Sequence, residues 1–165
     1  MKYRYYDPQT DLVPVCIMLN DFYKEVHEES WDKIYNLDGT RAYGVEGKLM
    51  YFLEDGCKCR VAENEEGRLI GFLIYNLIYD TIAVVRGIYF VPDYRKSTRL
   101  YGIFKQLFRD GVIKVYSQTY ANREPLDLRG EKRRRKLIAT KEDMNIWEYT
   151  HGSIQQDQKD IQESS

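Results

Sequence analysis

Hydrophobic positions change their spacing along the chain, and these changes predict its secondary structure. Residues 3–6 resemble a short opening strand. Residues 12–26 carry apolar side chains every three or four positions, which predicts an amphipathic helix; the stripe is Leu12, Val15, Cys16, Leu19, Phe22, Tyr23 and Val26. Asp11 directly precedes this stripe and is predicted to cap the helix with its carboxylate. A second helix is expected near the end of residues 38–53.

The middle of the chain switches to a strand pattern. Residues 57–64, 68–79 and 81–90 are rich in β-branched and aromatic side chains, and turn sequences at Glu65-Glu66-Gly67 and Tyr79-Asp80 separate them. The second and third of these segments are too apolar for a sheet with one solvated face. We therefore expect central strands that are covered on both sides.

Helical spacing returns at Leu100, Ile103, Phe104, Leu107 and Phe108, and Gly111 follows where a left-handed C-terminal cap belongs. Residues 112–120 are then predicted to form a strand, and a strand–helix–strand crossover of this kind is commonly parallel. Residues 137–139 and 146–149 are expected to form late edge strands.

The segment 83–108 combines a buried strand, a Pro-Asp turn, a short basic loop at 95–99 and an amphipathic helix. This order places the backbone N–H groups of a helix start among cations, at the end of a strand. Such a position suits a phosphate or pyrophosphate.

Composition supports a globular protein with one domain over residues 1–152. The 165 residues carry a net charge of −1, but its distribution is uneven. Residues 21–66 hold six Lys/Arg against twelve Asp/Glu, whereas residues 86–136 hold fourteen against five. The basic half suggests an anionic ligand there. Residues 153–165 lack core-forming side chains and are expected to be a disordered tail.

The cysteines do not indicate a disulfide framework or a metal centre. Cys57 and Cys59 form a C-x-C pair without a second cysteine pair, and the chain has two histidines. We therefore expect reduced core thiols and no metal. The N-terminus has no apolar signal region and no apolar run reaches membrane-spanning length. These features lead us to expect a soluble cytoplasmic protein.

Several of these segments resemble the GNAT superfamily of acyl-CoA-dependent N-acyltransferases. The sequence YRYYDPQTDLVPVCIMLNDF is similar to its first strand and helix, and GRLIGFLIYNLI to its third strand. GIYFVPDYRKSTRLYGIFKQLF is similar to its fourth strand, coenzyme A loop and third helix, with the lead-in Val-Pro-Asp-Tyr-Arg at residues 91–95. The resemblance extends to about Asn122. It implies an α/β (α+β) fold, with a mixed, mostly antiparallel sheet and helices on both faces.

The resemblance also implies a co-substrate site for acetyl-CoA. The backbone of the fourth strand would hold the pantetheine and polarise the thioester carbonyl, and the loop and helix start would bind the pyrophosphate. Carried over to this chain, the binding residues are Tyr89, Phe90, Val91, Arg95, Lys96, Ser97, Thr98, Arg99 and Asn122.

The chain departs from the family pattern at two places. Thr98 and Leu100 occupy loop positions where the family has Gly or Ala, whose small size allows the backbone close to phosphate. The family tyrosine that protonates the departing thiolate has no equivalent after Asn122, because the next tyrosine after Tyr120 is Tyr149.

Candidate catalytic groups are therefore taken from the neighbouring segments. Tyr120 and Tyr116 are candidate acids on the fifth strand. Asp80 at the strand turn is a candidate base, with Glu54 and Asp55 as alternatives, and each of these carboxylates is also an ordinary surface group.

Two functions remain open. The first is an N-acyltransferase acting on an amine of a small molecule or a protein, as a monomer or homodimer without a membrane. The second is a catalytically inactive GNAT-like module that binds a protein or nucleic acid. Nucleic acid would bind through Lys132, Arg133, Arg134, Arg135 and Lys136, but this is not favoured because no aromatic residue is interleaved for stacking.

Overall fold

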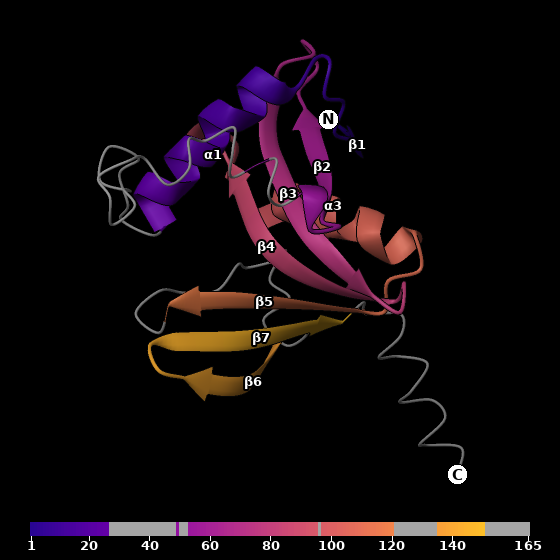
Figure 1. Cartoon of the computed structure of the whole chain (residues 1–165). Helices are drawn as coiled ribbons and strands as arrows, with labels where there is room; N and C mark the ends of the chain where they lie inside the picture. The colour runs from indigo at the N-terminus through magenta and orange to yellow at the C-terminus, as the bar shows by residue number, and fades with distance from the viewer. Residues whose placement is uncertain (27–48, 50–52, 96, 121–134, 151–165) are drawn as a thin grey trace. The chain divides into compact units, whose positions relative to one another are not determined.

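The computed structural model describes residues 1–26, 49, 53–95, 97–120 and 135–150. Its elements follow the order β1 (Lys2–Tyr5), α1 (Leu12–Val26), β2 (Lys58–Glu63), β3 (Leu69–Ile78), β4 (Ile82–Phe90), η2 (Pro92–Tyr94), α3 (Ser97–Arg109), β5 (Lys114–Tyr120), β6 (Arg135–Lys141) and β7 (Met144–Thr150). The strands form one sheet in the order β1-β2-β3-β4-β5-β7-β6 (Figure 1).

The sheet is mixed and mostly antiparallel, as predicted. β1, β2 and β3 pair antiparallel, as do β5 with β7 and β7 with β6. β4 and β5 pair in parallel, with Ile82 opposite Lys114 and Val84 opposite Tyr116. The prediction of two late edge strands was half wrong, because β7 lies between β5 and β6 and hydrogen-bonds to both.

Contacts between residues group into two compact units. Unit 1 contains residues 1–75 and 87–94, and unit 2 contains residues 76–86 and 95–165. β3 and β4 each contribute to both units, so the boundary does not fall in a linker. The single domain over residues 1–152 stays a prediction.

Unit 1 has its core between α1 and strands β2 to β4. In the predicted apolar stripe of α1, Leu12 is half-buried, and the buried members are Val15, Cys16, Leu19, Phe22 and Tyr23. This stripe packs against a cluster that includes Val61, Phe72, Ile74 and Tyr89. Figure 1 shows α1 lying across this part of the sheet. The helix forms because its apolar face has a strand surface to cover.

The two central strands, β3 and β4, differ in how far their side chains are buried. Residues 70–75 of β3 are all buried, which confirms a strand covered on both sides. β4 is less enclosed than predicted: Val84 and Val85 are half-buried and Arg86 is exposed, whereas Tyr89 and Phe90 at its end are buried. The enclosed part of β4 is therefore its carboxyl end.

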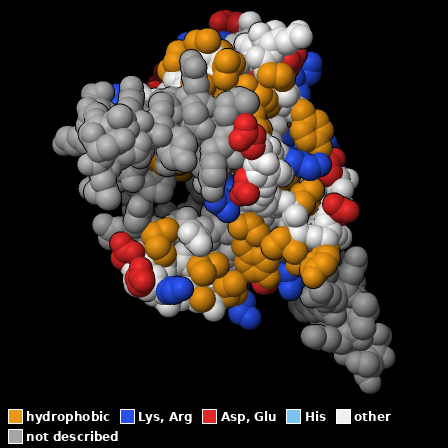
Figure 2. Space-filling view, in the orientation of Figure 1, with side chains coloured by type: hydrophobic (Ala, Val, Ile, Leu, Met, Phe, Trp, Pro, Cys, Tyr) orange, Lys and Arg blue, Asp and Glu red, His pale blue; other side chains and the backbone are white. Residues whose placement is uncertain are grey.

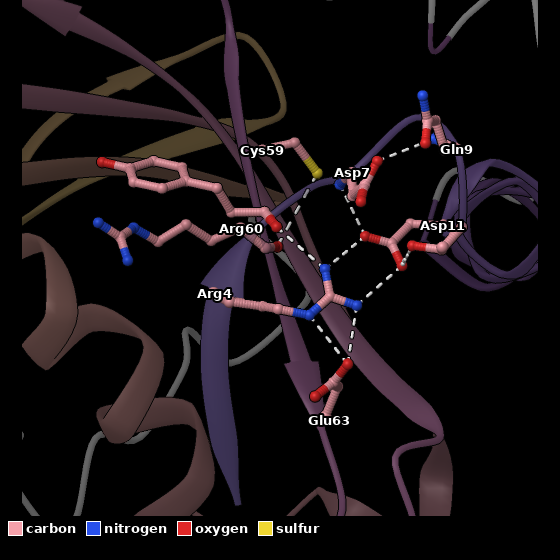
Figure 3. A network of polar contacts seen from close by, with 9 residues as sticks. Arg4, Asp7, Gln9, Asp11, Cys59, Arg60 and Glu63 are labelled. Carbon is pink, nitrogen blue, oxygen red and sulfur yellow. Dashed lines mark hydrogen bonds and ion pairs between the residues drawn. The ribbon is translucent and has the colours of Figure 1, made fainter.

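The carboxylate of Asp11, directly before α1, binds Arg4 of β1 rather than capping the helix as predicted (Figure 3). Its carboxylate accepts two hydrogen bonds from the Arg4 guanidinium, at 2.6 and 2.9 Å, and one from the backbone N–H of Asp7 at 2.7 Å. Arg4 also binds Glu63 of β2. Pro14 explains the difference, because it removes the N–H at the third helical position that such a carboxylate would accept from.

Unit 2 has α3 packed on its strands. Phe104 of α3 meets the ring of Tyr149 of β7 edge-on, with centroids 5.6 Å apart. The helix ends as predicted at Gly111, whose φ is +99°. The N–H of Gly111 donates to the carbonyl of Phe108 and that of Val112 to the carbonyl of Leu107, the bond pattern of a Schellman cap.

Some predicted features lie outside the described residues. These are most of the second helix in 38–53, of which Leu49, Leu53 and Glu54 are described and helical, and the tail 153–165. Within the described residues, no helix has the length and apolar character to cross a membrane. On the face shown in Figure 2, apolar side chains gather in several patches with charged side chains between them. The large exposed apolar side chains of unit 2 are Ile78, Tyr79, Ile113, Leu137 and Ile138.

Candidate functional site

The end of β4 offers a ligand its backbone rather than its side chains. The ring of Tyr89 is buried and stacks on Phe72, with centroids 6.0 Å apart. The ring of Phe90 is buried against Gly71, where an added Cβ would come within 2.8 Å of it. Both aromatic side chains are therefore buried, and Tyr89 belongs to the core cluster of unit 1.

The backbone N–H groups at this end of β4 divide between the two edges of the strand. The N–H of Val91 donates to the carbonyl of Ile70 on β3, at 2.9 Å. Since successive N–H groups of a strand point to opposite edges, the N–H of Phe90 faces away from β3. Of the three residues predicted to bind pantetheine, Val91 has its N–H already engaged and Phe90 presents one to the other edge.

A single turn of 3₁₀-helix, η2, leads the chain out of β4. The N–H of Tyr94 donates to the carbonyl of Val91 at 2.9 Å. The Tyr94 hydroxyl accepts a hydrogen bond from the side-chain amide of Asn64, at 3.2 Å. Arg95 follows directly and is exposed. Sequence reasoning missed Asn64, because it lies 30 positions before Tyr94 in a different hairpin.

The basic loop predicted at residues 95–99 is shorter in the structure. α3 begins at Ser97, so that Ser97, Thr98 and Arg99 form its first turn, while Lys96 lies outside the described residues. The N–H groups of a first turn have no acceptor within the helix and carry the positive end of its dipole. The sequence Arg95-Lys96 therefore leads directly into an anion-favouring helix start.

Replacement of the family glycines does not distort this backbone. Non-glycine residues with positive φ in the described part of the chain are Tyr79, Asp80 and Glu142, so Thr98 and Leu100 have ordinary helical φ values. The departures at these two positions change side-chain size near the helix start and leave the direction of its N–H groups intact.

Asp80 lies in the hairpin turn between β3 and β4. Tyr79 and Asp80 have φ values of +53° and +61°, and the N–H of Thr81 donates to the carbonyl of Ile78. These features define a type I′ turn, which confirms the predicted turn. Asp80 is exposed there and precedes β4, whereas the predicted pantetheine contacts lie at the other end of that strand.

Tyr116 has a partner that the sequence did not reveal. Its hydroxyl donates to the carboxylate of Glu148 on β7 at 2.8 Å, and Lys114 lies 3.9 Å from the same carboxylate. The hydrogen bond to Glu148, with some burial, raises the pKa of the Tyr116 phenol. Tyr116 is therefore protonated at neutral pH and can act as a proton donor but not as a base.

The remaining predicted site residues are less defined. Tyr120 is the last residue of β5, and its backbone pairs with Met144 of β7. Asn122 and residues 132–134 lie outside the described residues. Arg135 begins β6 with its guanidinium 5.2 Å from the centroid of the Trp147 ring, and Lys136 is exposed next to it.

The cysteines are free thiols, as predicted. Cys16, Cys57 and Cys59 are all buried, and burial raises the pKa of the Cys59 thiol to about 12. A thiol that stays protonated is a poor metal ligand and a poor nucleophile. Among the described residues, no group of His, Cys, Asp and Glu side chains could hold a metal ion.

Among known proteins, solved structures are similar to this chain. No family model and no curated protein sequence matches the chain. The ribosomal-protein-alanine N-acetyltransferase of Brucella melitensis matches 92% of this chain and 100% of its own, with a TM-score of 0.60 and 14% identity. The PaiA N-acetyltransferase of Thermoplasma acidophilum, in complex with coenzyme A, covers 91% and 98%, with a TM-score of 0.62 and 16% identity.

A third similar structure is the phosphinothricin acetyltransferase of Sinorhizobium meliloti in complex with AcCoA, described as a GNAT superfamily member. It covers 92% of this chain and 89% of its own, with a TM-score of 0.59 and 15% identity. Identities this low establish a shared fold. The chain has the fold of the GNAT N-acetyltransferases, a mixed seven-stranded sheet flanked by helices, in a divergent sequence.

Proposed function

We propose that this protein is an N-acyltransferase that takes its acyl group from acetyl-CoA. The observation that carries the proposal is the passage from the end of β4, through η2 and Arg95, into a helix that begins at Ser97. It combines strand backbone for a pantetheine with an anion-favouring helix start for a pyrophosphate. Two proteins of the same fold are complexes with coenzyme A or AcCoA, which supports this assignment.

In the proposed site, the first-turn N–H groups of α3 bind the pyrophosphate. Ser97, Thr98 and Arg99 supply these groups, and Arg95 and Lys96 supply positive charge next to them. The pantetheine lies along the backbone of residues 89–91, where the N–H of Phe90 donates to an acceptor of the ligand. Asn122, after β5, is the last proposed contact.

The proposed reaction is attack of a neutral amine on the thioester carbonyl. The new C–N bond forms as the C–S bond breaks, the amine loses a proton to a base, and the thiolate gains one from an acid. Tyr120, at the carboxyl end of β5, is our first candidate for the acid, and Tyr116 is the second because its hydroxyl is engaged by Glu148. Asp80, the base predicted from the sequence, precedes β4 while residues 89–91 lie at the end of that strand, so we leave the base unassigned.

The acceptor is proposed only as an amine. Proteins with the same fold are named for ribosomal-protein alanine, aminoglycosides and phosphinothricin, which are chemically unlike one another. The fold therefore accommodates very different acceptors, and for this chain we propose only that the acceptor carries an amine.

Calorimetric titration of the full chain with acetyl-CoA tests the proposal. We expect saturable binding that weakens at least about tenfold in Arg95→Glu, because reversal replaces attraction to the pyrophosphate by repulsion. Lys58→Glu, the same charge reversal on an exposed residue of β2, is the matched control and should change the Kd by less than about twofold. Wild-type protein without heat of binding at millimolar acetyl-CoA contradicts the proposal.

The second candidate function is a catalytically silent binding module. Thr98 and Leu100 in place of small residues, together with the cations that begin β6, favour it. Lys136 is exposed on this edge strand. Lys136→Glu should therefore weaken salt-sensitive binding to a partner while leaving acetyl-CoA binding unchanged. If the protein binds nucleic acid or a protein in a salt-sensitive way and does not bind acetyl-CoA, the result favours the binding module over the N-acyltransferase.

A further inference from the structure

Asn64 holds the β2–β3 hairpin loop closed through its own backbone and side chain. Its N–H donates to the carbonyl of Arg68 at 2.9 Å, and its carbonyl accepts from Gly67 at 3.0 Å. Its side-chain oxygen accepts from the N–H groups of Glu66 and Arg68, at 3.0 and 2.9 Å. These bonds close the turn, and an Asp or Ser side chain could make the same side-chain contacts.

The remaining group of the Asn64 side chain is a donor that the turn does not use. Because the two backbone N–H groups identify Oδ1 as the acceptor, Nδ2 must be the atom facing Tyr94. It donates to the Tyr94 hydroxyl at 3.2 Å. Asn carries the acceptor for the turn and this donor on two separate atoms, whereas an ionised Asp has no donor and Ser has a single polar atom.

Tyr94 is thereby anchored at both of its ends. Its backbone N–H is bonded to the carbonyl of Val91, and its half-buried side chain ends on Asn64. It is also the last residue before Arg95. The 3₁₀ turn that follows β4 is thereby tied to a hairpin 30 residues earlier in the chain.

We propose that Asn64 is a positioning residue for coenzyme A binding, acting through the Tyr94 hydroxyl on η2, the turn that directly follows the proposed pantetheine-binding residues 89–91. This inference rests on the proposed function. The hydrogen bond restrains Tyr94, so that η2 is held in its position next to the end of β4 before the ligand arrives. Orientation in advance lowers the entropic cost of binding.

Titration of the full chain with coenzyme A, combined with thermal unfolding of each variant, tests this role. Tyr94→Phe removes the hydroxyl and keeps the ring. Asn64→Ser keeps a turn-closing oxygen, but it is the only polar atom of that shorter side chain and no second atom remains to reach the Tyr94 hydroxyl. We expect each to raise the Kd about fivefold, the value of one neutral hydrogen bond. The Kd of the double variant should exceed that of either single variant by no more than about twofold, because both changes remove the same hydrogen bond.

The matched control is Tyr79→Phe, which removes the hydroxyl of a tyrosine that is 89% exposed and should leave the Kd unchanged. A purely structural role predicts a lower Tm with an unaltered Kd, and either that result or fully multiplicative effects in the double variant overturns the inference. Should Asn64→Ser fail to fold, Tyr94→Phe alone decides. Wild-type protein that does not bind coenzyme A contradicts the proposed function itself, which is a different outcome.

Discussion

The backbone N–H of Val91, the residue that follows β4, donates to the carbonyl of Ile70 on β3. Alternation along the strand then directs the N–H of Phe90 to the opposite edge. In the site we propose, this is the amide that donates to the pantetheine.

Replacing the Phe90 peptide N–H by an ester oxygen, through incorporation of the hydroxy acid, tests this assignment. We expect acetyl-CoA to bind about tenfold more weakly, because a neutral hydrogen-bond donor to the ligand is lost. The control is the same replacement at Tyr89, whose N–H faces β3 like that of Val91. It should reduce stability and leave the Kd within about twofold; equal losses at both positions would refute the assignment.

Gly71→Ala should destabilise the protein. The added Cβ would lie 2.8 Å from the Phe90 ring, which is 2% exposed and has no free space to enter. Overpacking of this kind costs about 1–3 kcal/mol. Gly87→Ala is the matched control, since its Cβ would meet atoms no nearer than 3.6 Å. Urea unfolding should therefore show a lower midpoint for Gly71→Ala than for Gly87→Ala, and equal midpoints would count against the packing described.

Asp11 should make the free energy of unfolding depend on pH in the acid range. The hydrogen bonds from Arg4 hold the pKa of this buried carboxyl below its ordinary value. A group whose pKa is lowered by folding stabilises the folded state above its unfolded pKa of about 4, and this contribution is lost as the pH falls through the folded pKa. Asp11→Asn should thus cost about 2–4 kcal/mol at pH 7 and progressively less below pH 4.

Denaturant unfolding of wild-type and Asp11→Asn protein at pH 7 and pH 3 measures this difference. Asp21→Asn, on the exposed side of α1, is the control and should show a small difference at either pH. A gap between wild type and Asp11→Asn that is as large at pH 3 as at pH 7 would rule out the ionised pair as its source.

Tyr116 should titrate above the ordinary tyrosine range in the wild-type protein, since its pKa is raised mainly by the hydrogen bond to Glu148. Glu148→Gln removes the negative charge and should return the pKa of Tyr116 toward about 10. Because folding raises this pKa, the pair stabilises the protein at pH values below 10 and ceases to do so as the phenol ionises. NMR of ring-labelled tyrosine, assigned with Tyr116→Phe, reports the titration; an identical curve in Glu148→Gln would be inconsistent with the pair.

Local sequence patterns predicted most of the helices and strands. The helical spacing from Leu100 to Phe108 and the glycine at 111 predicted α3 and its Schellman cap, because both depend on neighbours within one or two turns. Asp11 shows the limit of that reasoning. A following Pro14 already signalled the missing N–H, but the Arg4 partner required the pairing of β1 with β2.

Contacts set by strand order could not be read from the chain. Tyr116 meets Glu148 across 32 positions, because β7 inserts between β5 and β6 instead of forming a second edge. Asn64 and Tyr94 meet across 30 positions in the same way. Sequence patterns specify which residues form strands, whereas the neighbours of each strand depend on how the whole sheet closes its core.

The most direct test of the central claim is a crystal structure of the full chain grown with acetyl-CoA. The account predicts pyrophosphate oxygens within about 3 Å of the first-turn N–H groups of α3, and the pantetheine along β4 with the Phe90 N–H donating to it. Acetyl-CoA bound away from the start of α3, or not bound at millimolar concentration, would contradict the account.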